Sequence, residues 1–158
     1  SSDLVMDAAA NRDPQAVAQA CADKMWQDDR ASKGLGMTLQ RIAPGEAVLS
    51  MIVRKDMTNG HGICHGGFMF TLADSTFAFA CNTYDQRTVA QQCAVTFLAA
   101  VPEGETLTAH AVERNRAGRG GIYDVTVRDS SNKVVAEFRG HSRTISGRLL
   151  DEHQHDNS

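Results

Sequence analysis

The chain has 158 residues, of which 42% are apolar and 22% charged, a composition typical of one soluble globular domain with a hydrophobic core. The net charge is −3 and the pI about 6.0, so no overall basic field favours nucleic acid. The longest strongly apolar run, from Phe68 to Cys81, is too short and too polar to cross a bilayer. These properties predict a partner other than nucleic acid or membrane.

The ends of the chain and its cysteines indicate where the protein works. The first residues lack the charged n-region and apolar h-region of a signal peptide. The four cysteines form no CxxC pair, which favours reduced thiols in a cytoplasmic protein over a disulfide framework. We expect a flexible N-terminus over residues 1–12, a single domain over 13–146 and a flexible C-terminal tail over 147–158.

The first half of the chain predicts one helix and two strands. Asp13-Pro14 is typical of a helix start, with Asp as N-cap and Pro at the first helical position. Apolar residues then recur at spacings of three and four, which predicts a helix from Pro14 to Asp28 that Ser32-Lys33-Gly34 terminates. Between residues 37 and 54, two extended runs flank the turn Ala43-Pro44-Gly45-Glu46.

The second half predicts a buried helix and a set of strands. The run from Gly66 to Cys81 is apolar on nearly every side, which is typical of a buried helix. Period-two patterns then predict strands over residues 88–101, 106–115, 122–129 and 134–145. Because a sheet with one apolar face must cover that face, we expect an α+β domain. A mainly antiparallel sheet would wrap around the long central helix.

The stretch NGHGICHGG, residues 59–67, could hold a metal or a nucleophilic cysteine. His61, Cys64 and His65 offer three ligands, but no second cluster supplies the fourth that a structural zinc site needs. Cys64 lies before a helix N-terminus, where a thiolate is stabilised, yet a catalytic cysteine also needs a base and an orienting group. We therefore expect no metal, and a small buried side chain at Cys64.

The backbone of this stretch offers a third interpretation. Gly66 and Gly67 open the buried helix, where first-turn N–H groups lack internal acceptors and the helix dipole adds positive charge. Without side chains in the way, these amides could polarise a carbonyl that develops into an oxyanion. A simple glycine-rich connection is the alternative, and the pattern alone favours neither.

Asp74 stands in the middle of the apolar helix. Burial of a carboxylate is costly unless it is paired or used, and the helix contains no lysine or arginine. Asp74 is nine residues from His65, about 13 Å along a helix, so it cannot reach the N-terminus of its own helix. Two copies of the helix, side by side and antiparallel, would bring Asp74 of one chain beside Gly66-Gly67 of the other. This predicts an isologous dimer with two composite sites.

The segment NGHGICHGGFMFTLAD resembles the signature of the hotdog-fold acyl-CoA thioesterases. The likeness is strongest to the hydroxyphenylacetyl-CoA thioesterases of the phenylacetic-acid-degradation branch, and extends over residues 36–145. It includes the later CAVTFLAAVPEGETLTAHAVERNRAGRGGIYDVTVRD. The resemblance implies the hotdog fold, in dimers that pair into homotetramers, and hydrolysis of an aryl-acetyl-CoA or related medium-sized acyl-CoA.

The resemblance also assigns roles to residues of the motif. It implies that Asp74 is the nucleophile or general base and that Asn59 helps place the water or the thioester. His65 would stand near the thioester carbonyl and sulfur, and the amide of Gly66 or Gly67 would polarise the carbonyl. Some members hold the water with a hydroxyl one turn after the carboxylate, where this chain has Ala78. Ser75 or solvent would have to take that role.

A basic, glycine-rich segment provides candidate contacts to coenzyme A. Arginine forks suit phosphate, and the candidates for substrate binding are Arg114, Arg116, Gly118 and Arg119. The alternative is a solvated turn, and the two interpretations stay open. Because coenzyme A is part of the substrate, no cofactor is expected.

Two other functions fit parts of the pattern. An acyl-CoA hydratase on the same fold would need His65 and Asp74 closely paired, which the spacing allows only across a dimer. A non-catalytic acyl-CoA-binding module would need the pocket but not Asp74, and normally brings a second, partner-binding domain.

Overall fold

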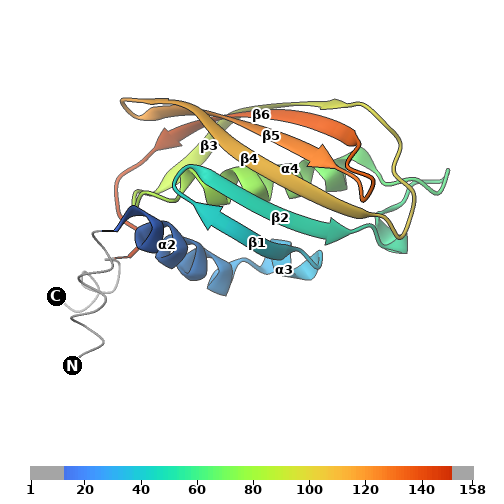
Figure 1. Cartoon of the computed structure of the whole chain (residues 1–158), viewed down its shortest axis with the longest axis horizontal. Helices are drawn as coiled ribbons and strands as arrows, with labels where there is room; N and C mark the ends of the chain where they lie inside the picture. Colours follow the sequence, from blue (N-terminus) through green and yellow to red (C-terminus); the bar gives the residue numbers. More distant parts are fainter. Residues whose placement is uncertain (1–12, 151–158) are drawn as a thin grey trace.

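The structure, a computed structural model, describes residues 13–150. Six antiparallel strands form one curved sheet, and helix α4 (Gly66–Cys81) lies against one of its faces (Figure 1). The strands are β1 (Thr38–Ala43), β2 (Glu46–Ile52), β3 (Thr88–Phe97), β4 (Thr106–Ala117), β5 (Gly120–Arg128) and β6 (Val134–Thr144). Their order is β1-β2-β4-β5-β6-β3, which leaves β1 and β3 at the edges. The predicted α+β fold, with a sheet around a long helix, is confirmed.

The N-terminal helices pack beside β1. Helix α2 spans Pro14–Asp28, the bounds that the Asp13-Pro14 signal predicts. A second, short helix, α3, follows at Arg30–Gly34 in place of a simple break. It forms because the side chain of Asp29 accepts a hydrogen bond from the Ser32 N–H at 2.9 Å, which caps a new helix start.

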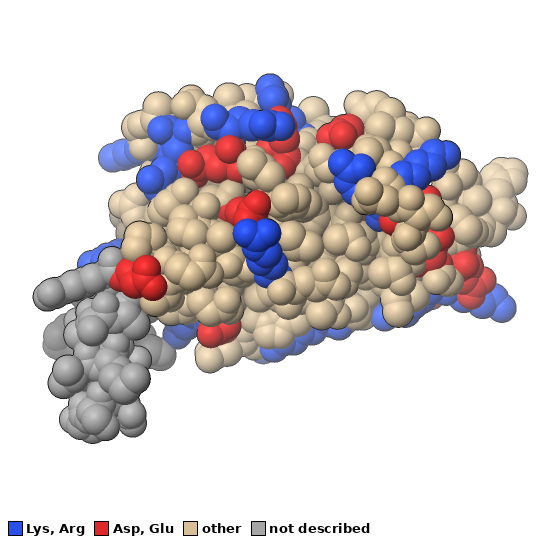
Figure 2. All heavy atoms as spheres, viewed as in Figure 1, with Lys and Arg blue, Asp and Glu red and all other residues tan. Residues whose placement is uncertain are grey.

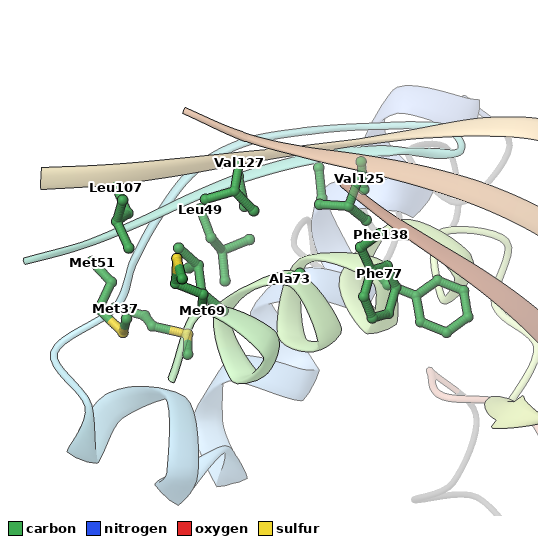
Figure 3. Packing of buried hydrophobic residues seen from close by; sticks show 14 of the residues in the cluster. Met37, Leu49, Met51, Met69, Ala73, Phe77, Leu107, Val125, Val127 and Phe138 are labelled. Carbon is green, nitrogen blue, oxygen red and sulfur yellow. The ribbon is translucent and has the colours of Figure 1, made fainter. Parts of the chain in front are cut away.

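The core lies between α4 and the concave face of the sheet. Inward-facing side chains of the central strands, such as Leu49, Leu107 and Val125, point toward the helix (Figure 3). Phe77 approaches the sheet so closely that a Cβ at position 140 would lie 2.7 Å from its ring, which explains Gly140. Burial of these apolar side chains is the main favourable contribution to folding.

The other side of α4 is only half-covered by its own chain. Phe68, Asp74 and Ala78 are partly exposed, whereas the residues facing the sheet are buried. The apolar sequence of the helix predicted burial on every side, so this expectation is wrong for the single chain. The open side of the helix carries the carboxylate of interest.

Strand β3 has an irregular pairing and an early end. Its register against β6 shifts between Ala90 and Gln92, and beyond this bulge Cys93, Val95 and Phe97 lie opposite β6 residues that face α4. The strand ends at Phe97, so the predicted extension to residue 101 is wrong.

The residues after β3 contact the motif loop instead of continuing the sheet. Val101 accepts a backbone hydrogen bond from the Cys64 N–H at 2.7 Å, and Pro102 forms an isolated bridge with Ile63. The segment that follows β3 therefore braces residues 59–65 at the start of α4.

The described residues beyond the last strand contact the domain. Asp85 accepts hydrogen bonds from the Leu149 and Leu150 N–H groups and from Arg148. Residues 147–150 thus contact the domain, although they were expected to begin a flexible tail; residues 1–12 and 151–158 lie outside the described part. All four cysteines are free thiols. No helix within residues 13–150 is long and apolar enough to span a membrane.

Candidate active site

Asn59 organises the loop that precedes α4. Its Oδ1 accepts hydrogen bonds from the N–H groups of His61 at 2.9 Å and Ile63 at 3.4 Å. Its own N–H donates to the Ile63 carbonyl, and the His65 N–H donates to the Met57 carbonyl. The side-chain carbonyl of Asn59 therefore holds the loop, and its amide group remains as the donor available to a ligand.

His65 caps the helix that it precedes. Its Nδ1 accepts a hydrogen bond from the Gly67 N–H at 3.0 Å. Position 67 suits glycine, since a Cβ there would lie 3.1 Å from the same nitrogen. With Nδ1 as acceptor, the proton of the neutral ring is on Nε2, which can donate to a ligand. The expected pair of open amides is thus reduced, because the Gly67 amide is already used.

Gly66 lines an apolar groove, and its N–H makes no hydrogen bond within residues 13–150, so this amide is open there. The groove has a volume of about 430 Å³ and is lined by Asn59, Ile63, Cys64, Gly66, Met69, Phe97, Leu98, Ala99 and Ala100. The Phe97 ring lies so close to Gly66 that a Cβ there would be 2.8 Å from the ring. Sequence reasoning missed Phe97, because its contact with Gly66 depends on where β3 ends.

Asp74 lies on the open side of α4, in the middle of the helix. Partial burial raises the pKa of its carboxyl group above the ordinary value of 3.8. Within residues 13–150 no ion pair includes Asp74; its hydrogen-bond partner there is the Cys93 thiol, with Sγ 4.0 Å from Oδ1. The alternative, that a lysine or arginine pairs with Asp74, thus has no support in the described part. Asp74 is therefore the functional candidate that its burial suggests.

The single chain does not bring Asp74 to the open amide. Asp74 does not line the groove that contains Gly66 and Asn59, and it lies eight positions after Gly66 along the helix, a rise of about 12 Å. Ser75, the candidate for holding a water, instead places its Oγ 2.9 Å from Ser32 Oγ in α3. The groove and the carboxylate therefore lie on different parts of the same helix.

The arginine segment forms the tight turn between β4 and β5 at the opposite end of α4. Arg116, Gly118 and Arg119 line a pocket of about 270 Å³ there, together with Cys81 at the end of α4. Figure 2 shows basic side chains gathered at the upper left, around the tip of this hairpin, with acidic side chains beside them. Three of the four predicted substrate-binding residues therefore share one pocket.

Arg114 does not line this pocket. Its Nε lies 2.9 Å from Asp124 Oδ2, and the same carboxylate is bound at two points by Arg139. The two arginines lower the pKa of Asp124, Arg139 first. Arg114 is thus engaged in an ion-pair cluster on the outer face, which does not fit the prediction that it contacts substrate.

Arg116 is held by an aromatic and a carboxylate. Its guanidinium lies 3.5 Å from the centroid of the Tyr84 ring, a cation–π contact. The hydroxyls of Tyr84 and Tyr123 each donate to Glu113 Oε1 at 2.9 Å. Burial and the hydrogen bond to Glu113 raise the pKa of Tyr84 to about 12, so its hydroxyl remains a donor. Sequence reasoning missed this cluster, since its members come from three elements.

The cysteine and metal interpretations of the motif receive no support. Cys64 is buried, and its thiol lies 3.5 Å from the His65 carbonyl. Burial raises the pKa of the Cys64 thiol, which is opposite to what a nucleophile needs. No group of three or more potential metal ligands occurs within residues 13–150.

Comparison with known proteins identifies the class to which this fold and site belong. A profile of the thioesterase superfamily matches residues 61–136, the motif loop, α4 and most of the sheet that covers it. Acyl-coenzyme A thioesterase PaaI of Escherichia coli (strain K12) is 40% identical over 83% of this chain and 94% of that protein. The chain therefore belongs to the thioesterase superfamily, with the hotdog fold and relatives that are thioester hydrolases.

Solved structures agree with this assignment. The structure of E. coli PaaI, from the phenylacetic acid degradation operon, has a TM-score of 0.83 and covers 85% of this chain and 97% of that one. A mutant of PaaI from Thermus thermophilus is 38% identical with a TM-score of 0.72, over 74% of this chain and 100% of that one. The predicted resemblance to the acyl-CoA thioesterases of this branch is confirmed.

Proposed function

We propose that this protein hydrolyses the thioester of an aryl-acetyl-CoA, such as hydroxyphenylacetyl-CoA, or of a related medium-sized acyl-CoA. The names of its relatives support an acyl-CoA substrate and phenylacetate degradation. The apolar lining of the groove at Gly66 suits an aromatic or medium-sized acyl group. These relatives are thioesterases, which favours hydrolysis over the hydratase and binding-module alternatives.

The separation of Asp74 from the open Gly66 amide carries the proposal of a composite site. Two copies with antiparallel α4 helices would place Asp74 of one beside Gly66 of the other, so the working unit is at least a homodimer. Two such dimers would pair into a homotetramer, as the family resemblance implies. The arginine pocket at the far end of α4 would then lie toward the partner's groove, where Arg116 and Arg119 could hold the phosphates of coenzyme A.

In this site the thioester carbonyl accepts a hydrogen bond from the Gly66 amide, which stabilises the developing oxyanion. Asp74 attacks the carbonyl carbon or removes a proton from the water that attacks it. The C–S bond then breaks, and the coenzyme A thiolate leaves and takes up a proton. After direct attack, water hydrolyses the mixed anhydride on Asp74, which releases the carboxylic acid and restores the free carboxylate. Asn59 and the Nε2–H of His65 are donors near the carbonyl and the sulfur.

Complementation between inactive variants tests the composite site. Asp74→Asn removes the carboxylate, and Gly66→Val puts a side chain beside the open amide, where the Phe97 ring now lies. Each homodimer should be inactive, whereas unfolding and refolding an equal mixture should restore about a quarter of wild-type activity, because half of the dimers then contain one intact site. Failure to regain activity from two folded variants would contradict a site shared between copies.

A panel of acyl-CoAs tests the substrate class. Release of free thiol should be fastest with phenylacetyl-CoA and its hydroxylated forms, and slower with acetyl-CoA and long-chain acyl-CoAs. A single turnover in oxygen-18 water separates the two roles of Asp74, since direct attack leaves label in its carboxylate and a general base does not. Absence of thiol release from every acyl-CoA would contradict the proposed activity.

A further inference from the structure

Cys93 contacts the proposed catalytic carboxylate from a different element. It lies on β3 just beyond the bulge, faces α4 and packs against the core. Its thiol donates to Asp74 Oδ1 across 4.0 Å, which joins residues 19 positions apart in the sequence. No residue of the motif makes this contact.

The groups around Asp74 are neutral donors rather than charges. Burial raises the pKa of the Cys93 thiol, and the carboxylate raises it further, so the group remains S–H. Cys81 on α4 also interacts with Asp74, and burial raises its pKa to about 12. On the α3 side, the hydroxyls of Ser32 and Ser75 pair with each other, and Ser32 donates to Asp29.

The two oxygens of Asp74 differ in their surroundings. Oδ1 accepts from Cys93, while Oδ2 has no hydrogen bond within residues 13–150. In the same part of the chain, no buried side-chain oxygen lacks a partner, so Oδ2 is accessible. One oxygen is therefore held and the other is free to react.

We propose that Cys93 is a positioning residue for thioester hydrolysis: its S–H holds Oδ1 of Asp74 so that Oδ2 faces the substrate. This inference rests on the proposed catalytic role of Asp74. A thiol is a weak donor that carries no charge, so it can orient the carboxylate without neutralising it.

Kinetics of three variants test the inference. Cys93→Ala should lower kcat about tenfold with little change in KM, since a hydrogen bond to a charged group is lost. It should also move the acid limb of the kcat–pH profile to higher pH, because the thiol donor stabilises the ionised carboxylate and its loss raises the pKa of Asp74. Cys93→Ser keeps a hydrogen-bond donor, so the acid limb should stay at its wild-type pH. Val95 is the next inward-facing residue of β3. Val95→Ala removes side-chain volume but no hydrogen-bond donor, so it should not shift the acid limb.

Defined results would overturn the inference. A Cys93→Ala profile identical to wild type with unchanged kcat would exclude positioning, as would equal shifts from Cys93→Ala and Val95→Ala. If Asp74→Asn keeps wild-type turnover, the proposed role of Asp74 fails instead, so the two failures are distinguishable.

A measurement independent of activity covers variants that fold poorly. The infrared S–H stretch of Cys93, assigned from the difference between wild type and Cys93→Ser, should lie at the lower frequency of a hydrogen-bonded thiol. In Asp74→Ala, which has no acceptor, the same band should move to higher frequency. An identical band in both proteins would contradict the hydrogen bond.

Discussion

Asp74 is the residue at which reactivity and stability oppose each other. Its pKa is raised by burial, so the folded chain holds the proton at pH values where the unfolded chain has released it. Ionisation therefore lowers the free energy of unfolding as the pH rises through this window, and the cost persists at neutral pH. A group that weakens the fold in this way is typical of a functional site.

Asp74→Asn should lower thioesterase turnover by about 10²–10⁴-fold while raising the melting temperature at pH 7. The gain in melting temperature should vanish at a pH below the unfolded-state pKa, where both side chains are neutral. Scanning calorimetry at several pH values, beside an assay of thiol release, measures both effects. Near-wild-type turnover would remove Asp74 from the mechanism.

His65 combines a structural and a catalytic role that two substitutions can separate. His65→Ala loses the cap on α4 and should destabilise the protein by about 1 kcal/mol. His65→Asn restores a capping oxygen for the Gly67 N–H but lacks the Nε2–H donor, so stability should return without full activity. Both variants should lose less turnover than Asp74→Asn; a larger loss would indicate a hydratase-like role for His65.

Sequence reasoning reaches some residues of the site and not others. Asp74 stands out because a carboxylate in an apolar helix is costly wherever the helix packs. The use of the Gly67 amide by His65 depends on the orientation of one ring, which spacing does not determine. The contacts of Cys93 and Phe97 depend on strand register and on the end of a strand, so no local pattern predicts them.

At the scale of elements, the β4–β5 hairpin separates arginines with different partners. Arg116→Gln and Arg119→Gln should each raise KM for acyl-CoA several-fold with little change in kcat, since phosphate contacts supply binding. Arg114→Gln is the matched control, because its charge is already paired with Asp124 outside the pocket. Steady-state kinetics at low and high salt measure the effect. Equal KM values for all three variants would place coenzyme A elsewhere.

Local sequence signals predict the bounds of the helices better than those of the strands. The start of α2 at Pro14 follows from its cap and proline, and α4 has the predicted bounds of Gly66 and Cys81. The end of β3 is set instead by competition for backbone partners, because Val101 accepts from the motif loop rather than from β6. An apolar sequence that continues past Phe97 gives no sign of that change.

At the scale of the whole molecule, the edge strand β3 is the surface that the proposed second copy would occupy. Among the described residues, this strand pairs with β6 on one side only. Apolar side chains near it are unusually open, with exposed fractions of 44% for Val89, 48% for Phe97 and 54% for Leu98. Unpaired backbone groups beside apolar side chains favour pairing with another strand.

Val89→Lys should shift the protein toward monomers and remove activity, because each proposed site needs two chains. Ile52→Lys, at a residue of β2 with an exposed fraction of 57%, should leave the dimer intact. Sedimentation velocity with a parallel activity assay compares the two. An active Val89→Lys monomer would contradict the composite site.

The bulge in β3 determines which side chains of the strand face α4. Ala90 lies opposite Ser142, a buried residue of β6, and strict alternation from Ala90 along this chain would make 92, 94 and 96 the next inward positions. Because residue 91 is bulged out of the ladder, Cys93 reaches Asp74 and Phe97 reaches Gly66 instead. Deletion of Gln91 alone would therefore leave a regular strand in which Cys93 still lies opposite Gly140 and Phe97 opposite Ala136. Deletion of both Gln91 and Gln92, outside every motif of the sequence, would instead turn Cys93 and Phe97 away from α4 at once and uncouple this strand from the proposed site.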